Sequence, residues 1–174
     1  MSKILTFNMY TPFQNLTSVN SGSTSTSLTE VNLGSIFVPG GTFKTGDIVK
    51  IETMARKVGT TSTSSFKLYW NTANSISSPT PIQIAQNLSI TNTQLTLFFN
   101  RRLAIRDSSG SNSGTFTYTS NSTAATDYDN NLITNSQGST LAINWQIDGW
   151  LILAGNVANA TDNIRSEYIR LTNG

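Results

Sequence analysis

The chain has 174 residues, a net charge of +2 and no histidine or cysteine, and only 11% of its residues are charged. The absence of both residue types excludes a Ser-His-Asp triad, the commonest general base, and thiolate-bound zinc or iron–sulfur clusters. The small net charge, with no dense basic stripe, argues against nucleic-acid binding. We therefore expect no cofactor, no metal and no enzymatic activity.

Uncharged polar residues take the place that charged residues usually fill. Ser, Thr and Asn make up roughly 40% of the chain, far above their share in ordinary globular domains. Thr favours strands, whereas Ser and Asn favour turns, and good helix formers are sparse. No apolar run has the length of a membrane span or a signal peptide. The composition predicts one all-β domain, made in a cytoplasm and not inserted into a membrane.

The first 25 residues predict an extended N-terminal arm, followed by a folded domain over residues 26–174. Apolar side chains recur at every third position of the arm, a period that fits an extended ribbon better than a strand or helix. Two interpretations remain open: irregular strands of the domain itself, or an arm that packs on a neighbouring subunit or a larger assembly. The candidate assembly residues are Ile4, Phe7, Tyr10, Phe13 and Leu16.

Residues 27–38 predict the first core strand. Its apolar residues, Leu28 and Phe37 among them, are expected to contribute to the core, and Gly34 is expected to mark a bulge or bend. Residues 38–71 then predict two further strands. Positions 48–57 alternate between Val, Ile, Thr or Ala and mostly charged residues, the pattern of a half-buried strand. A second alternating run covers 66–71, and we expect it to return antiparallel beside the first, as a hairpin with a wet outer face.

The rest of the chain predicts more strands of the same kind. Arg101 interrupts the apolar side of one long strand, which predicts a bulge near residues 100–102. In total about eight strands, with regularly spaced turn signals, favour a single-domain jelly-roll β-sandwich. The later strands are expected at 82–90 as a short edge strand, at 94–107, around 116–118, at 139–155 with a turn or kink at 148–149, and at 164–171. The continuously apolar run at 150–154 is the pattern of a strand buried on both faces.

Three tyrosines and one acidic loop are candidate ligand contacts. Tyr69, Tyr118 and Tyr128 have rings that can stack on the apolar face of a sugar, although tyrosines in strands usually serve packing. Asp127 and Asp129 gather the oxygen ligands that calcium takes. Their loop lacks the glycine and closing glutamate of a helix–loop–helix calcium site, so a solvated loop is the favoured interpretation.

Other charged residues offer weaker candidates. Arg101, Arg102 and Arg106 lie near two phenylalanines, and arginine with aromatic rings can bind single-stranded nucleic acid. The two faces of a strand explain this pattern better, so we expect no nucleic-acid partner.

The acidic residues are scattered along the chain. Glu52 and Glu167 could meet on one sheet face, as the carboxylates of a glycosidase do. Each is instead expected to pair with a strand neighbour such as Lys67 or Arg165. No catalytic residue is predicted.

Several motifs together resemble the jelly-roll proteins of bacteriophage particles. They are VPGGTFKTGDIVKI at 38–51, FKLYWNT at 66–72, RRLAI at 101–105 and NWQIDGWLI at 144–152. Each alone is a strand with a turn, and it is their order, over roughly residues 27–171, that carries the resemblance. The family includes tail-fibre tips, head fibres and capsid-decoration proteins, and is similar to the trimeric tumour-necrosis-factor-type jelly roll.

The resemblance implies a structural, non-enzymatic virion component, displayed on the particle surface after synthesis in the host cytoplasm. It implies a homotrimer whose arm contacts other virion proteins, and it transfers no site residue. Because the jelly roll is nearly the whole chain, a small decoration, head-fibre or spike protein is favoured over a complete tail fibre. The alternative is a carbohydrate-binding receptor-recognition module of a tail fibre, with a host-surface glycan as ligand.

Overall fold

The computed structural model describes residues 13–15, 25–93, 95–111, 114–120 and 136–173. Its regular elements in these ranges are β-strands, as predicted, and the described residues include no helix that could span a membrane. The strands are β1 (Phe13–Asn15), β2 (Val31–Val38), β3 (Ile48–Val58), β4 (Ser64–Asn71), β5 (Ile82–Ile90), β6 (Thr96–Ile105), β7 (Thr115–Ser120), β8 (Ser136–Leu141), β9 (Gly149–Val157) and β10 (Asn163–Asn173).

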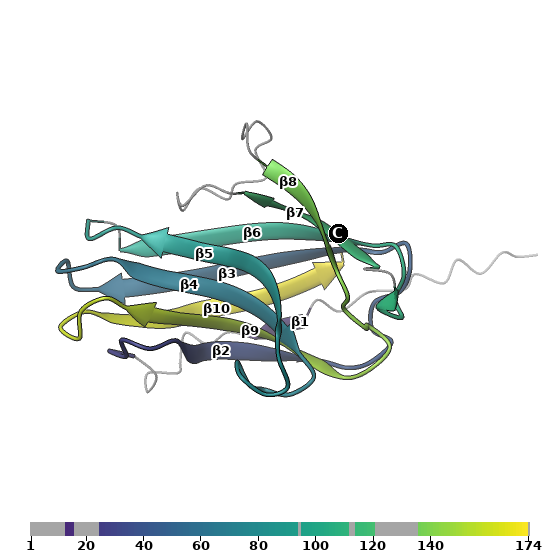
Figure 1. Cartoon of the computed structure of the whole chain (residues 1–174), viewed down its shortest axis with the longest axis horizontal. Coiled ribbons are helices and arrows are strands. Elements are labelled where there is room, and N and C mark those ends of the chain that lie inside the picture. The colour runs from purple at the N-terminus through teal and green to yellow at the C-terminus, as the bar shows by residue number, and fades with distance from the viewer. Residues whose placement is uncertain (1–12, 16–24, 94, 112–113, 121–135, 174) are drawn as a thin grey trace, which may run out of the picture.

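The strands form two antiparallel sheets that lie face to face (Figure 1). The six-stranded sheet has the order β1-β10-β3-β6-β7-β8, and the four-stranded sheet has the order β2-β9-β4-β5. When the β7–β8 pair is set aside, the other eight strands follow the order of a jelly roll, so that successive strands alternate between the sheets except at β4–β5. The predicted jelly-roll sandwich is therefore confirmed, with β7 and β8 as an extension of one sheet.

The predicted arm pairs with the sandwich at two points, both on β10. Residues 13–15 form β1, which pairs with the end of β10 so that Phe13 lies opposite Leu171. Ser25 makes an isolated bridge to Ile164 of the same strand. The other candidate assembly residues lie outside the described ranges: Ile4, Phe7, Tyr10 and Leu16.

The predicted hairpin of β3 and β4 is wrong. β3 pairs with β10 and β6, whereas β4 pairs with β9 and β5 in the other sheet. Alternation reveals which side of a strand is buried, but not which strand lies beside it. The outer face of β4 is not wet either, because Tyr69 and Asn71 are 7% and 3% exposed.

Arg101 does not create the bulge that the sequence predicts. The register of β3 with β6 is unbroken from Ile48 opposite Ala104 to Arg56 opposite Thr96. Arg101 therefore stays on the inward face, 3% exposed, with its guanidinium carbon 5.2 Å from the centroid of the Phe99 ring. A long aliphatic stem and a cation over an aromatic face make this burial tolerable.

The bulge predicted at Gly34 is confirmed, because the register of β2 with β9 shifts between Asn32 and Gly34. Not every apolar residue of this region enters the core, however. Leu28 and Phe37, which the sequence analysis assigned to it, are 59% and 41% exposed. Phe37 points outward because its neighbours Ile36 and Val38 face the core.

One end of the sandwich is closed by aromatic side chains from one sheet and from two loops. The ring of Trp145 lies 4.7 Å from Trp70 and 5.4 Å from Phe43, and its indole NH donates to the Thr115 hydroxyl at 2.8 Å. Trp70 belongs to β4 and Thr115 to β7, so this group joins the sheets. Gly149 is required here because a Cβ at that position would overlap the Trp70 ring.

The opposite end is closed by two buried charged residues under three turns, at residues 59–63, 91–95 and 158–162 (Figure 1, left). The Lys57 ammonium donates to the carbonyl oxygens of Ser62 at 2.6 Å and Thr91 at 2.8 Å. The Asp162 carboxylate accepts from the amides of Thr61 and Ser62 and from the Ser62 hydroxyl. We call this group of contacts the loop junction.

The charge of Asp162 is stabilised within the loop junction. Burial by itself raises the pKa of the carboxyl, but the hydrogen bonds from Thr61 and Ser62 and the nearby Lys57 charge outweigh it. The pKa of Asp162 therefore lies below its ordinary value of 3.8. Both Lys57 and Asp162 are thus structural charges, fully covered by the turns they join.

The loop junction predicts a large effect of removing the Lys57 charge. Lys57→Met leaves two buried carbonyl oxygens without a donor and Asp162 without its nearby cation, and should lower the free energy of unfolding by about 3 kcal/mol. Urea denaturation followed by tryptophan fluorescence measures it. Lys50→Met is the control, because Lys50 forms a partly exposed ion pair with Glu52 and should cost less than about 1 kcal/mol. Equal losses in the two variants would contradict the role of Lys57.

Candidate functional site

The outer face of the four-stranded sheet holds Tyr69, a predicted ligand contact, and is the best-defined polar surface of the described structure. Opposite residues of antiparallel strands lie on the same face, so the register gives two outward rows. Phe37, Trp150 and Asn71 form one row, and Ser35, Ile152 and Tyr69 form the next. We call this surface the outer sheet face.

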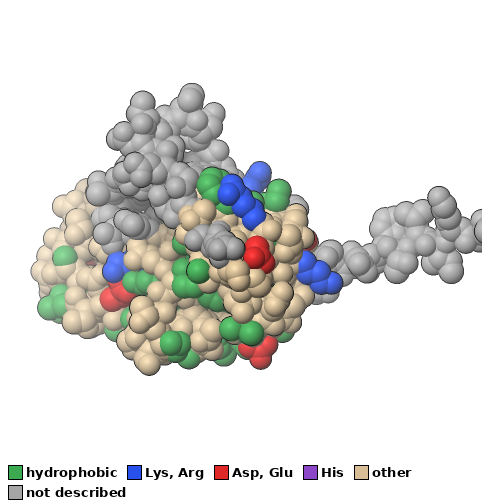
Figure 2. Space-filling view, turned by 45° about the vertical axis from the view of Figure 1, so that its right-hand side comes forward, with side chains coloured by type: hydrophobic (Ala, Val, Ile, Leu, Met, Phe, Trp, Pro, Cys, Tyr) green, Lys and Arg blue, Asp and Glu red, His purple; other side chains and the backbone are tan. Residues whose placement is uncertain are grey.

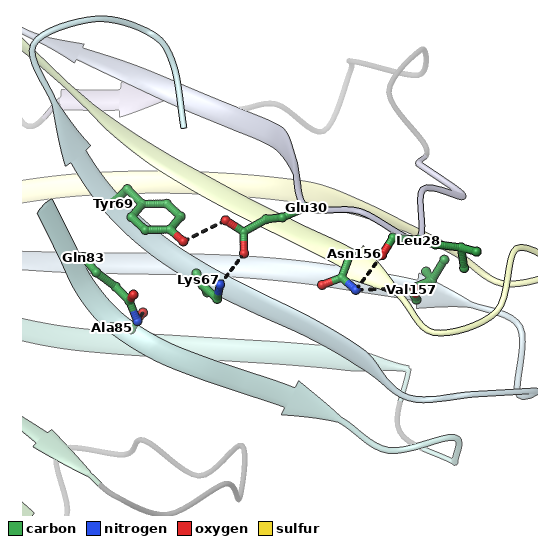
Figure 3. Close-up of polar contacts among 8 residues, drawn as sticks. All are labelled: Leu28, Glu30, Lys67, Tyr69, Gln83, Ala85, Asn156 and Val157. Carbon is green, nitrogen blue, oxygen red and sulfur yellow. Dashed lines mark hydrogen bonds and ion pairs between the residues drawn. The ribbon is translucent and has the colours of Figure 1, made fainter. Parts of the chain in front are cut away.

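Glu30, Lys67 and Tyr69 make a polar clamp on this face (Figure 3). One carboxylate oxygen of Glu30 accepts from the Tyr69 hydroxyl at 2.7 Å, and the other lies 2.7 Å from the Lys67 ammonium. Glu30 directly precedes β2, whereas Lys67 and Tyr69 belong to β4, so the contact spans β9 between them. Nearby, the Asn156 amide donates to the Leu28 carbonyl at 3.2 Å and fixes the segment that leads to Glu30.

The contacts of the clamp stabilise the protonated forms of Lys67 and Tyr69. The hydrogen bond to Glu30 raises the pKa of Lys67 above its ordinary value, against the opposing effect of burial. Burial, followed by the same carboxylate, raises the pKa of Tyr69. At neutral pH Tyr69 is therefore a neutral donor and Lys67 a cation. Neither residue is suited to act as a base or nucleophile, because each holds its proton more tightly than usual.

The loop at residues 72–81 covers part of the outer sheet face, crossing β9 and β2 in Figure 1. The Asn71 amide donates to the carbonyl oxygens of Ser75 and Pro79, both at 2.7 Å, and Asn32 donates to the Asn74 side chain at 2.8 Å. Ile76 then packs against a small apolar cluster of Tyr69, Trp150, Ile152 and Ala154. Tyr69 is 7% exposed as a result, so little of its ring is open to a ligand.

The sequence analysis missed the aromatic pair that remains open beside this loop. Phe37 and Trp150 lie opposite each other in β2 and β9, with ring centroids 5.2 Å apart and planes tilted by 55°. Phe37 is 41% exposed and Trp150 is partly exposed. The apolar run at 150–154 suggested burial on both faces, which hid Trp150. The outward parity of Phe37 between Ile36 and Val38 was the signal that could have found the pair.

The other predicted ligand residues are not brought to this face. Tyr118 belongs to β7 of the six-stranded sheet, and its side chain is outside the described part of the structure, as is that of Phe13. The acidic loop with Asp127, Tyr128 and Asp129 also lies outside the described residues. Among those that are described, no three Asp or Glu side chains come close enough to hold a metal ion.

The three arginines do not form one basic patch. Arg101 points into the core, Arg102 is exposed, and the Arg106 guanidinium carbon lies 4.3 Å from the centroid of the Phe116 ring. Neighbouring positions on a strand project to opposite faces, which separates Arg101 from Arg102.

The acidic residues of the six-stranded sheet are paired with cations. Glu167 contacts Arg165 at 2.7 Å, as predicted. Glu52 contacts Lys50 at 2.7 Å and Arg170 at 3.7 Å. The predicted partner Lys67 is wrong for Glu52, because β4 lies in the other sheet.

No protein-family model, curated protein or solved structure matches the chain. The acidic side chains of the described residues are bound to cations or to backbone amides. What the described structure offers is fixed side chains on contact surfaces.

The clamp predicts a pH dependence of stability. Because folding raises the pKa values of Tyr69 and Lys67, their stabilisation is complete below about pH 10 and is lost as the pH rises through the folded-state values. Tyr69→Phe should cost about 1 kcal/mol at pH 8, since it removes one hydrogen bond to a carboxylate. Its stability should then fall less steeply than that of the wild type between pH 10 and pH 11.5. Urea denaturation at each pH measures both quantities, and parallel declines would contradict the role of the tyrosine.

Proposed function

We propose that this chain is a non-enzymatic structural component of a bacteriophage particle. In this proposal it is displayed at the particle surface as a capsid-decoration, head-fibre or spike protein and assembles as a homotrimer. The ordered resemblance of residues 27–171 to such proteins supports it, and so does the jelly-roll order of the strands. The observation that carries the proposal is a concentration of exposed apolar side chains on one side of the six-stranded sheet.

Three of the seven large apolar side chains that are exposed among the described residues lie on the outward side of β3 and β6. They are Ile48, Val58 and Phe98, each between 42% and 46% exposed, whereas the exposed Leu95 precedes β6 and has the parity of the buried Leu97. Single exposed apolar residues are normal on a protein surface, but a group of them on one sheet marks a contact surface. We call the outer side of β10, β3 and β6 the assembly face.

The register arranges the assembly face in rows across the strands. Tyr168, Met54 and Phe98 form one apolar row, and Ile48 and Ala104 begin a second. Between these rows lies a polar band in which Lys50 and Arg170 pair with Glu52. Burial raises the pKa of Tyr168 above its ordinary value, and Glu52 adds to the rise, so the Tyr168 hydroxyl stays neutral. The band also carries Arg102, opposite Lys50, so it has three cations around one carboxylate. The apolar rows on either side of the band are the part of this face that suits burial against another copy of the chain.

The trimer that the resemblance implies, and the assembly face as its interface, can be tested together. Light scattering after gel filtration should give three times the 18.8 kDa mass of one chain at micromolar concentration. Phe98→Glu should reduce the mass to that of a monomer, because it places a charge in an apolar contact. Leu28→Glu is the matched control, since Leu28 is 59% exposed and lies away from this face. A monomeric wild type would refute the trimer, and equal effects of both substitutions would refute this surface as its interface.

The virion location has its own test. Antibodies raised against the purified chain should label intact phage particles from the source of the sequence, and electron microscopy should place the label on the capsid or at a fibre tip. Particles that lack the polypeptide by mass spectrometry would end the proposal, whatever the oligomeric state of the isolated chain.

A second candidate function is recognition of a carbohydrate on the host surface. The exposed aromatic pair of Phe37 and Trp150 favours it, because aromatic rings open to solvent pack well on the apolar face of a sugar. A displayed particle protein can carry such a site, so the two functions are compatible.

A further inference from the structure

We infer that Phe37, Trp150 and Asp148 form a contact site for a neutral saccharide at one end of the outer sheet face. The inference rests on the carbohydrate-binding function proposed above and gives it a place and a ligand class. The site differs from the tyrosines that the sequence singled out.

The aromatic floor of the site is built by strand register. Phe37 on β2 and Trp150 on β9 are directly opposite, and the planes of their rings are tilted by 55°. Two adjoining rings of this size match the apolar face of one or two sugar rings. Trp150 is held by the neighbouring strands β2 and β4 on both sides of β9, whereas Phe37 lies on the edge strand β2, which pairs with β9 alone.

Trp150 is held on its other side as well. Asn71 lies opposite it on β4 and anchors the base of the 72–81 loop through two hydrogen bonds. Ile76 of the loop packs on the cluster to which Trp150 belongs. The loop and the indole therefore pack on the same cluster, and Trp150 stays partly exposed beside Phe37. A ring fixed in this way loses little conformational freedom when a ligand binds.

Asp148 supplies the polar partner of the aromatic floor. It directly precedes β9, two residues before Trp150 in the chain, and its carboxylate is turned toward the segment that follows β2, which carries Phe37. The Gly40 amide donates to its Oδ1 at 2.8 Å, and Asp148 remains exposed. A carboxylate oriented in this way can accept hydrogen bonds from adjacent sugar hydroxyls. The side chains of Asn74 and Ser77 on the neighbouring loop are exposed as further uncharged donors and acceptors.

The charge of the site selects a neutral ligand. Asp148 would repel the carboxylate of an acidic sugar. Lys67, the basic residue described on the outer sheet face, is already paired with Glu30. Figure 2 shows a surface that is mainly uncharged, with basic and acidic side chains in separate small groups. A neutral polysaccharide of a cell surface fits these conditions.

The tryptophans of the chain provide a direct readout. Trp70 and Trp145 are each 2% exposed, so acrylamide should quench chiefly the partly exposed Trp150. An array of neutral bacterial-surface polysaccharides, with alginate as the acidic counterpart, first identifies a bound glycan. An oligosaccharide of that glycan should then protect the wild-type fluorescence from acrylamide.

Matched variants separate this site from the assembly face. Phe37→Ala and Asp148→Asn, both at exposed positions, should weaken glycan binding at least tenfold. Phe98→Ala is the control, because Phe98 is 42% exposed against 41% for Phe37 and lies on the other sheet. It should leave glycan binding by the isolated chain unchanged, and both Phe37→Ala and Asp148→Asn should keep the wild-type mass.

Each contrary result overturns the inference. The wild type could bind no neutral glycan, it could prefer alginate, or Phe98→Ala could weaken binding as much as Phe37→Ala does. A change of mass in Phe37→Ala would also contradict the inference, because the aromatic pair would then be an interface between copies. None of these results affects the labelling of particles, so failure of the glycan site is distinguishable from failure of the virion role.

Discussion

The burial of inward side chains between the two sheets is the interaction on which every other feature depends. Each strand presents alternate residues to the interior, and the jelly-roll order brings consecutive strands to opposite sides of one core. The constraint is strong enough to carry Arg101 inward rather than break the register of β6. It also forces the open ends of the sandwich to be closed, by Trp145 and its neighbours at one end and by the loop junction at the other.

Because side chains fill the interior, contacts with other molecules must be made at the outer surfaces. The outer surfaces of the two sheets differ. The outer sheet face is covered by a loop and by the Glu30 clamp, which leaves one aromatic pair open at its edge. The assembly face of the other sheet carries apolar rows on either side of a polar band, and several of its apolar side chains are exposed among the described residues. One surface therefore suits a small ligand and the other suits a second copy of the chain, which is how a structural role and a recognition role can coexist.

Local sequence predicted strands and their buried sides well, because alternation is a property of each strand alone. It placed the edge strand β5 and the bulge at Gly34 correctly. Pairing is different, since it depends on segments far apart in the chain. The β3–β4 hairpin and the Glu52–Lys67 pair failed for that one reason. The open aromatic pair was missed because Phe37 and Trp150 stand in apolar runs, where only the parity of a position distinguishes an outward side chain from an inward one.

Lys57 performs a task that other loop-rich proteins give to calcium, whose ligands are likewise carbonyl and carboxylate oxygens. Here the cation is tethered to the polypeptide by four methylene groups. Dilution therefore cannot remove this cation, and a chelator finds no metal ion to extract at this position. The two turns that Lys57 bridges are therefore held together without any dependence on the calcium content of the surroundings.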